Sequence, residues 1–155
     1  MRSVLFVCTA NICRSPVAEG VLRSMLAARG VDAAKVRIDS AGTSDYRVGQ
    51  PPFPLAVESA AKRGYKVGQR AARQVTARDF DEFDLVLAMD RSNIDELMSV
   101  CPPRLRPKIE LLLDYGDAHR GEDVPDPFGR RAKAFERTLD LIEEGCRGLA
   151  RSLTR

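Results

Sequence analysis

Short apolar runs and alternating segments divide the chain into predicted strands. Apolar runs at 4–7, 84–89 and 109–113 are typical of strands buried on both faces of a parallel sheet. In the segment 35–40, Val36 and Ile38 alternate with polar neighbours, which indicates a further strand. Strands are therefore expected at 4–7, 35–40, 84–89 and 109–113.

Helical periodicities fill the intervals between these strands. Ser15 followed by Pro16 predicts a helix start with Ser15 as the N-cap, and Gly30 marks the end of that helix. Further helices are expected at about 55–63, within 71–83 and at 92–100. The last helix carries one apolar stripe, formed by Phe135, Leu139, Ile142, Cys146 and Leu149.

Alternating strands and helices predict an α/β fold, with a four-stranded parallel sheet flanked by helices on both faces. In such sheets, ligands bind beyond the carboxyl ends of the strands, where the strand order reverses. The turn after the first strand is therefore the first place to look for a site. No internal repeat or linker divides the chain, so residues 1–155 are expected to form a single domain.

The composition excludes several classes of function. The 155 residues are 44% hydrophobic and 30% charged, as in ordinary globular proteins. A net charge of +3 is too small for a nucleic-acid-binding surface, and the basic clusters at 104–108 and 130–133 are interpreted as solvated surface. No apolar run approaches the ~18 residues of a membrane span, and the N-terminus lacks a signal-peptide pattern. We therefore expect a cytoplasmic protein without nucleic-acid or membrane partners.

Cysteine and histidine usage narrows the chemistry further. The four cysteines are interpreted as thiols rather than as a disulfide framework. The only histidine, His119, lies in a segment rich in Gly and Asp and is interpreted as a solvent-exposed loop residue. The chain therefore lacks the histidines needed for a metal site with several histidine ligands.

The turn after the first strand has the pattern of an anion-binding loop. Cys8 is followed by five residues and then by Arg14 and Ser15. A tight turn leading into a helix points backbone N–H groups into one concavity, which suits a tetrahedral dianion and favours a thiolate at Cys8. Arg14 would hold two phosphate oxygens, and the hydroxyl of Ser15 would donate to the sulfur. The loop between them consists of Thr9, Ala10, Asn11, Ile12 and Cys13.

Other interpretations of this loop have less support. A cysteine at the end of a buried strand can serve only as a small hydrophobic residue, but Arg14 and Ser15 at these offsets argue against that. Cys8 and Cys13 could bind a metal, although the partners needed to complete four ligands are lacking. The sequence has no Gly-x-x-x-x-Gly-Lys loop, which disfavours nucleoside triphosphate chemistry.

The loop and several later motifs closely resemble the low-molecular-weight protein tyrosine phosphatases. The resemblance begins with the strand at 4–7 and continues from Cys8 through the loop to Glu19. Further matches are Asp39-Ser40-Ala41-Gly42-Thr43, Asp45-Tyr46, Arg73-Gln74, Phe83-Asp84, Met89-Asp90 and Val124-Pro125-Asp126-Pro127-Phe128. These motifs occur in order and span nearly the whole chain.

The resemblance implies a Rossmann-like, three-layer domain that uses no metal and no cofactor. Asp126 would be the general acid and base beside the Cys8 nucleophile, while Tyr46 and Phe128 would form the aromatic walls of the substrate pocket. The resemblance assigns Asn11 to the support of the strained loop. Cys13 resembles the family's second thiol, which can form a reversible disulfide with the nucleophile.

The implied substrate is a phosphotyrosine-containing protein, with a tyrosine kinase as one candidate, and the implied product is inorganic phosphate. Ile12 favours phosphotyrosine, because related phosphoarginine phosphatases tend to carry threonine at this loop position. The chain is expected to be a monomer or a weak dimer. Three alternatives remain: a phosphoarginine phosphatase, an arsenate-reductase-like thiol enzyme, and a phosphopeptide-binding module with little turnover. The reductase would need further reactive cysteines near the loop, and Cys101 and Cys146 are not placed as a pair.

Three departures from the family pattern leave efficiency and substrate choice open. Phe53 and Leu55 stand in a segment where the family usually shows Pro-Asp-Pro-Arg, and Arg70 replaces a common histidine. Both changes are expected to remove polar partners that support the loop. Gly129 stands in place of a second aromatic residue and is expected to narrow the aromatic rim.

Overall fold

The computed structural model describes residues 2–155, in which four parallel strands form one sheet. The strands are β1 (Arg2–Cys8), β2 (Val36–Gly42), β3 (Leu85–Ala88) and β4 (Ile109–Leu111). They lie in the order β2-β1-β3-β4, and Val4 of β1 is paired with Ile38 on one side and Leu85 on the other. The four predicted strands are confirmed, although β4 is shorter than expected because Leu112–Tyr115 turns into a 3₁₀ helix.

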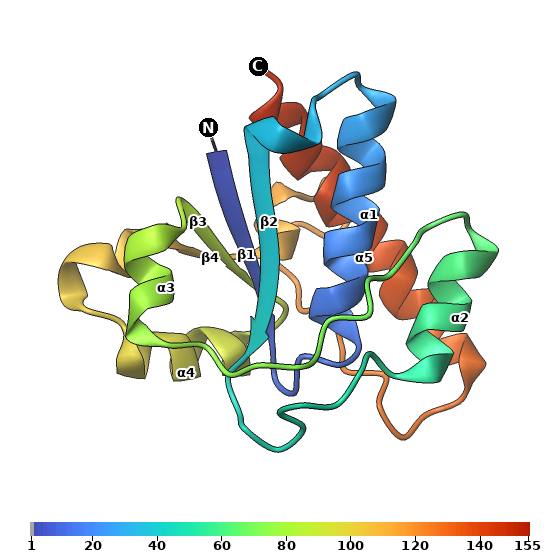
Figure 1. The fold of residues 1–155 in the computed structure, drawn as a ribbon, viewed down its shortest axis with the longest axis horizontal. Helices are drawn as coiled ribbons and strands as arrows, with labels where there is room; N and C mark the ends of the chain where they lie inside the picture. Colours follow the sequence, from blue (N-terminus) through green and yellow to red (C-terminus); the bar gives the residue numbers. More distant parts are fainter. Residues whose placement is uncertain (1) are drawn as a thin grey trace.

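Helices cover both faces of this sheet (Figure 1). One face carries α1 (Arg14–Ala28), α2 (Pro54–Lys62) and α5 (Ala132–Leu153), and the other carries α3 (Ala77–Glu82) and α4 (Arg91–Val100). Short 3₁₀ helices occur at Ala33–Lys35, Pro103–Lys108 and Leu112–Tyr115. The predicted α/β fold class is confirmed. No helix in residues 2–155 combines the length and the apolar character needed to cross a bilayer.

Alternate side chains of β1 enter two separate hydrophobic clusters. Val4 and Phe6 pack with residues of α1, α2 and α5, whereas Leu5 and Val7 pack with residues of α3 and α4. All four side chains are fully buried. A central strand covered on both faces has no position that favours a polar side chain, which explains the continuous apolar run.

The first helix begins one residue before the predicted N-cap. α1 starts at Arg14, with Cys13 in the N-cap position and without a side-chain cap. The prediction of Ser15 as the N-cap was wrong. Its hydroxyl lies instead 2.9 Å from the Cys8 sulfur and accepts a hydrogen bond from Asn11, and such long-range partners are invisible to a local capping rule.

Because the strands are parallel, the loops that follow β1, β2 and β3 lie at one edge of the sheet, and the strand order reverses beside β1. In Figure 1 this edge is at the bottom of the view. The backbone N–H of Thr43 donates to the carbonyl oxygen of Cys8 at 2.9 Å, which joins the first two loops. Gly42 permits this close approach, since a Cβ there would lie 2.7 Å from the carbonyl oxygen of Thr9.

Candidate active site

A cavity of about 440 Å³ opens beyond the carboxyl end of β1. Its walls come from the loop after β1, the loop after β2 and the loop that precedes α5. The lining residues are Cys8, Thr9, Ala10, Ile12, Cys13, Arg14, Tyr46, Arg47, Asp126 and Phe128. Of the sequence-predicted site residues, only Asn11 and Ser15 are outside this lining, and both are buried. Arg47 is the one lining residue that the sequence interpretation missed.

Neighbouring segments hold the carbonyl groups of the loop and leave its N–H groups free. The bonds run from the N–H groups of Thr43 to Cys8 (2.9 Å), Ser44 to Thr9 (3.0 Å) and Phe53 to Ile12 (2.8 Å). Within residues 2–155, the backbone N–H groups of residues 10–13 donate no hydrogen bond. Free N–H groups in a tight turn at a helix start form a binding site for an oxyanion.

Asn11 supports the loop from below. Its φ of 59° lies in the left-handed region, which asparagine adopts more readily than most residues. Its Oδ1 accepts from the N–H of Arg73 at 3.0 Å, and its Nδ2 donates to the hydroxyls of Ser15 and Ser40, each at 2.9 Å. The side chain thus ties the loop to β2 and to the segment before α3.

Arg14 is fixed beside the thiol and is only 2% exposed. Its guanidinium donates to the carboxylate of Asp90 at 2.6 Å and to the carbonyl oxygen of Val124 at 2.8 Å, and it lies 3.7 Å from the carboxylate of Asp126. Burial by itself lowers the pKa of this group, but negative charge at Cys8 and the hydrogen bond to Asp90 outweigh burial and raise the pKa above its usual value. Arg14 is therefore a permanent positive charge in a defined position.

Two residues at the start of α4 hold this arrangement in place, and the sequence interpretation gave them no role. Asp90 caps α4 by accepting from the N–H of Asn93 at 2.8 Å, and its other oxygen accepts from Arg14. The buried side chain of Asn93 donates to the hydroxyl of Thr9 at 3.1 Å. Aspartate after a strand signals a helix start, but only the pairing of β1 with β3 brings it to Arg14.

Asp126 lies at the rim of the cavity with 49% of its side chain exposed. One carboxylate oxygen accepts from the N–H of Phe128 at 3.0 Å, which orients the side chain. The loop is anchored two residues earlier, where the N–H of Val124 donates to the carbonyl oxygen of Met89 at 2.8 Å. The carboxylate is thus held beside the cavity while it remains open to water.

Aromatic side chains form the mouth of the cavity. Tyr46 is 77% exposed, and Phe128 packs edge-on against Phe53 with ring centres 5.1 Å apart. Phe53 stacks in turn on Phe135 at 6.0 Å. The guanidinium of Arg47 lies 4.9 Å from the centre of the Phe128 ring. Phe53, a departure from the family pattern, therefore supports the pocket wall through its ring and the loop through its backbone N–H.

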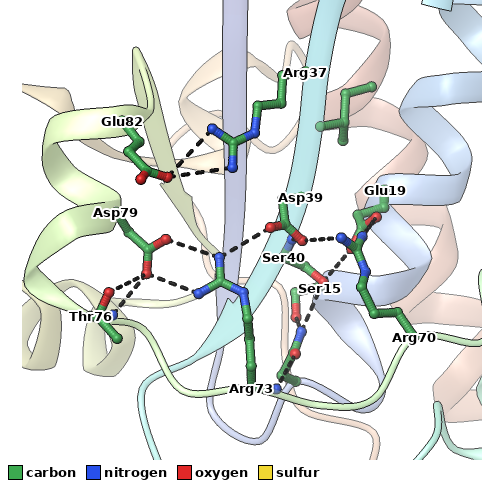
Figure 2. Close-up of polar contacts among 12 residues, drawn as sticks. Ser15, Glu19, Arg37, Asp39, Ser40, Arg70, Arg73, Thr76, Asp79 and Glu82 are labelled. Atoms are coloured by element: carbon green, nitrogen blue, oxygen red, sulfur yellow. Dashed lines mark hydrogen bonds and ion pairs between the residues drawn. The ribbon is translucent and has the colours of Figure 1, made fainter.

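Arg70 supports the loop through two ion pairs (Figure 2). Its guanidinium contacts the carboxylates of Glu19 at 2.7 Å and Asp39 at 2.8 Å. Glu19 also accepts a hydrogen bond from the hydroxyl of Ser40, which contacts Asn11. The expectation that Arg70 removes a polar partner was wrong, because its long side chain reaches both carboxylates.

The cysteines differ in their surroundings, and all four are free thiols, as predicted. Burial, followed by the negative charges at Cys8 and Asp126, raises the pKa of Cys13 to about 12. Cys13 is therefore protonated at neutral pH although it lines the same cavity as Cys8. Cys101 and Cys146 are buried in different hydrophobic clusters, and neither lines this cavity.

His119 lies in a loop, as predicted, but it is less exposed than expected. The ring is partly buried, and its Nδ1 lies 2.7 Å from the carboxylate of Glu144, which also accepts the backbone N–H of His119. Glu144 is a buried residue of α5, so the contact attaches the loop to that helix. Sequence pattern placed the residue in a loop but gave no sign of this partner.

The fold and the site together define the class of protein: an α/β fold whose first strand ends in a loop with Cys8, free backbone N–H groups and the fixed guanidinium of Arg14. Residues 3–155 match the family model of the low molecular weight phosphotyrosine protein phosphatases. The chain belongs to this family of hydrolases, and the resemblance seen in its motifs is confirmed.

Individual relatives are similar over nearly their whole length. The low molecular weight protein-tyrosine-phosphatase YfkJ of Bacillus subtilis is 39% identical over 155 residues, which cover 100% of this chain and 97% of the relative. The low molecular weight phosphotyrosine protein phosphatase of Gallus gallus is 40% identical, with 95% and 92% covered. A crystal structure of a protein tyrosine phosphatase from Entamoeba histolytica matches with a TM-score of 0.94 at 36% identity, covering 99% of this chain and 97% of that chain.

Proposed function

We propose that the chain hydrolyses phosphotyrosine and other aryl phosphate monoesters through a phosphocysteine intermediate, without a metal or cofactor. The observation that carries the proposal is the position of the Cys8 sulfur, 2.9 Å from the Ser15 hydroxyl in a loop with free N–H groups at 10–13. Arg14 is fixed beside the same loop. A sulfur nucleophile and the donors that stabilise an oxyanion are thus combined in one short segment.

In the first step, the Cys8 thiolate attacks phosphorus in line with the departing phenolate. The P–S bond forms, the P–O bond to the aryl group breaks, and the carboxyl group of Asp126 transfers its proton to the phenolate oxygen. Arg14 and the loop N–H groups stabilise the charge on the three equatorial oxygens. This role is supported by the position of Asp126, which lines the cavity and is open to solvent.

In the second step, the carboxylate of Asp126 takes a proton from water, and the water oxygen attacks phosphorus. The P–S bond breaks, and its electron pair returns to Cys8 as a thiolate, which accepts a hydrogen bond from Ser15. Inorganic phosphate leaves, and the enzyme regains its starting state. The same carboxyl group thus serves first as acid and then as base.

The shape of the cavity supports an aryl substrate. Tyr46 and Phe128 stand at the mouth and Ile12 lines the wall, so a flat ring attached to the phosphate has apolar surfaces on which to pack. Phosphoserine has a shorter side chain and no ring that could pack on these surfaces. We therefore propose a phosphotyrosine-containing protein, such as a tyrosine kinase, as the partner.

The test is a substrate panel with chelator present, comprising phosphotyrosine, phosphoserine, phosphoarginine and arsenate. The wild type is expected to turn over phosphotyrosine preferentially. Cys8→Ser is expected to lose activity by roughly 10⁴-fold or more while it still binds inorganic phosphate in a calorimetric titration. Dependence on added metal, or substantial turnover by Cys8→Ser, would refute the mechanism.

Cys101→Ser is the matched control, because it removes a buried thiol outside the cavity. Its activity is expected to equal that of the wild type. Preferred turnover of phosphoarginine, or reduction of arsenate, would instead support one of the alternative functions. Phosphate binding without turnover by the wild type would support a phosphopeptide-binding module.

A further inference from the structure

A second cavity of about 440 Å³ lies next to the active site. Asp126 lines both cavities, so the loop that carries this carboxylate separates them. The second cavity is also lined by Arg130 and Arg137, whereas Asp126 is the one carboxylate in its lining. A peptide whose phosphotyrosine reaches Cys8 would thus pass near a cavity with excess positive charge.

The arginines of this region are not neutralised by ion pairs. Among the ion pairs of residues 2–155, none involves Arg47, Arg130, Arg131, Lys133 or Arg137. A guanidinium nitrogen of Arg137 lies 3.2 Å from Nε2 of His119, and the guanidinium of Arg47 lies over the ring of Phe128. Their charges are therefore available to a ligand. Unpaired charges of one sign at a cleft attract a ligand of the opposite sign.

The backbone leaves the approach to Arg130 open. The N–H of Arg130 donates to the carbonyl oxygen of Pro127 at 3.0 Å, which fixes the turn that presents its side chain. Gly129 precedes it with a φ of 80°, and a Cβ added there would meet nothing within 4 Å. Gly129 thus places no side chain beside Arg130.

We infer that this cavity is a subsite for an acidic side chain that flanks the phosphotyrosine in the substrate. The inference rests on the proposed function, since it concerns the peptide around the phosphorylated residue. Arg130 and Arg137 would hold the carboxylate, and Arg47 would attract further acidic residues to the mouth of the active site. The cluster at 130–133, interpreted from sequence as solvated surface, thus acquires a role in substrate selection.

The expected preference is moderate, because these side chains are accessible to solvent. A single exposed guanidinium–carboxylate pair changes an affinity by about 1.5- to 5-fold. Two or three such pairs should favour an acidic peptide by roughly 5- to 20-fold in kcat/KM at low ionic strength. Added salt should reduce the preference, since it screens exposed charges.

The test compares two phosphotyrosine peptides that differ only in having Glu or Gln at the positions on both sides of the phosphorylated residue. The readout is the ratio of their kcat/KM values, in which effects on the chemical steps cancel. The wild type is expected to favour the Glu peptide, and Arg130→Gln is expected to lower the ratio about 2- to 5-fold, mainly through KM. Arg47→Gln should lower it as well.

Lys35→Gln is the matched control for net charge. Lys35 is exposed, forms no ion pair in residues 2–155 and precedes β2, at the opposite end of the sheet from the site. Its removal should leave the ratio unchanged. A wild-type ratio near one, a ratio that Arg130→Gln leaves intact, or an equal loss in Lys35→Gln would overturn the subsite. Failure of the proposed function would be distinct, because neither peptide would be hydrolysed.

Discussion

Hydrogen-bond directions beneath the loop are set by groups that can only accept or only donate. The carboxylate of Glu19 accepts, so the proton of Ser40 points to it, and Ser40 accepts in turn from the amide of Asn11. The second N–H of that amide donates to Ser15. The Ser15 proton is then free for the sulfur of Cys8, 2.9 Å away. The chain of contacts therefore makes Ser15 the donor and the sulfur of Cys8 the acceptor in this contact.

The role of Asp126 can be tested through the leaving group. Asp126→Ala is expected to slow hydrolysis of phenyl phosphate by roughly 10²–10⁴-fold, because a poor leaving group needs a proton. Esters with very good leaving groups should be nearly unaffected in the first step. Asp123→Asn is the control, since that carboxylate lies in the same loop but contacts the backbone of Arg91 instead. An equal loss for both ester types would remove Asp126 from the acid role.

Cys13 is expected to protect the nucleophile from permanent oxidation. Peroxide would convert the Cys8 thiolate to a sulfenic acid with release of hydroxide, and Cys13 would then displace water to form a disulfide that a dithiol can reduce. Mild peroxide should thus inactivate the wild type reversibly but Cys13→Ser irreversibly, with Cys101→Ser behaving as the wild type. If recovery of activity is the same in Cys13→Ser, the redox proposal fails.

The pH dependence of this disulfide follows from the pKa of Cys13, which burial raises to about 12. The thiolate is the attacking form, and its fraction rises about tenfold per pH unit below that pKa. Closure should therefore slow as the pH falls, which can be measured by stopping the reaction with an alkylating agent after a peroxide pulse. A rate independent of pH would contradict attack by the Cys13 thiolate.

At the scale of elements, the sequence predicted those features that depend on residues close together in the chain. The apolar run of β1 and the apolar stripe on α5 indicate which surfaces of these elements are buried. The motif from Cys8 to Ser15 could be recognised because its residues are neighbours in the chain. The roles of Asp90 and Arg70 could not, because their partners lie 76 and 51 residues away and only the folded sheet brings them together.

Helices α2 and α5 are joined by a cluster of ion pairs. Arg63, directly after α2, contacts the carboxylates of Glu136, Asp140 and Glu143 on α5 at 2.7, 2.8 and 2.5 Å. The helices position the Phe53 and Phe135 rings that support the pocket wall. Arg63 thus connects α2, which follows the loop after β2, to α5, which follows the loop that carries Asp126.

Removal of this cluster should lower the free energy of unfolding. Arg63→Ala is expected to cost about 1–2 kcal/mol, since its three partly exposed pairs each contribute roughly 0.2–1 kcal/mol. Lys62→Ala is the control, because its pair with Glu58 is exposed and 4.0 Å long, and it should change stability by less than about 0.5 kcal/mol. Urea unfolding gives both values. Equal losses in the two variants would show that the cluster contributes nothing.

At the scale of the whole molecule, two tyrosines are expected to make the stability of the fold sensitive to alkaline pH. Burial, followed by the hydrogen bond to Glu143, raises the pKa of Tyr65 to about 12. Burial and the charge of Glu110 raise the pKa of Tyr115 to about 12 as well. The unfolded chain ionises these groups near their ordinary value of 10.0, whereas the folded chain keeps them protonated. The stabilising contribution is thus complete below pH 10 and is lost as the pH rises towards 12.

Urea midpoints measured from pH 8 to pH 11 test this expectation over the range in which the tyrosines of the unfolded chain ionise before those of the folded chain. The wild type should lose stability steadily above pH 10, and the double variant Tyr65→Phe, Tyr115→Phe should lose it less steeply, because it has no such protons to release. Tyr46→Phe controls for the loss of a tyrosine, since Tyr46 is 77% exposed and lies outside both hydrophobic clusters. The same slope in all three proteins would mean that these phenols ionise alike in the folded and unfolded chains. A shallower slope confined to the double variant would show that the loss of stability at alkaline pH arises from the contacts of Tyr65 and Tyr115, and not from the active-site loop.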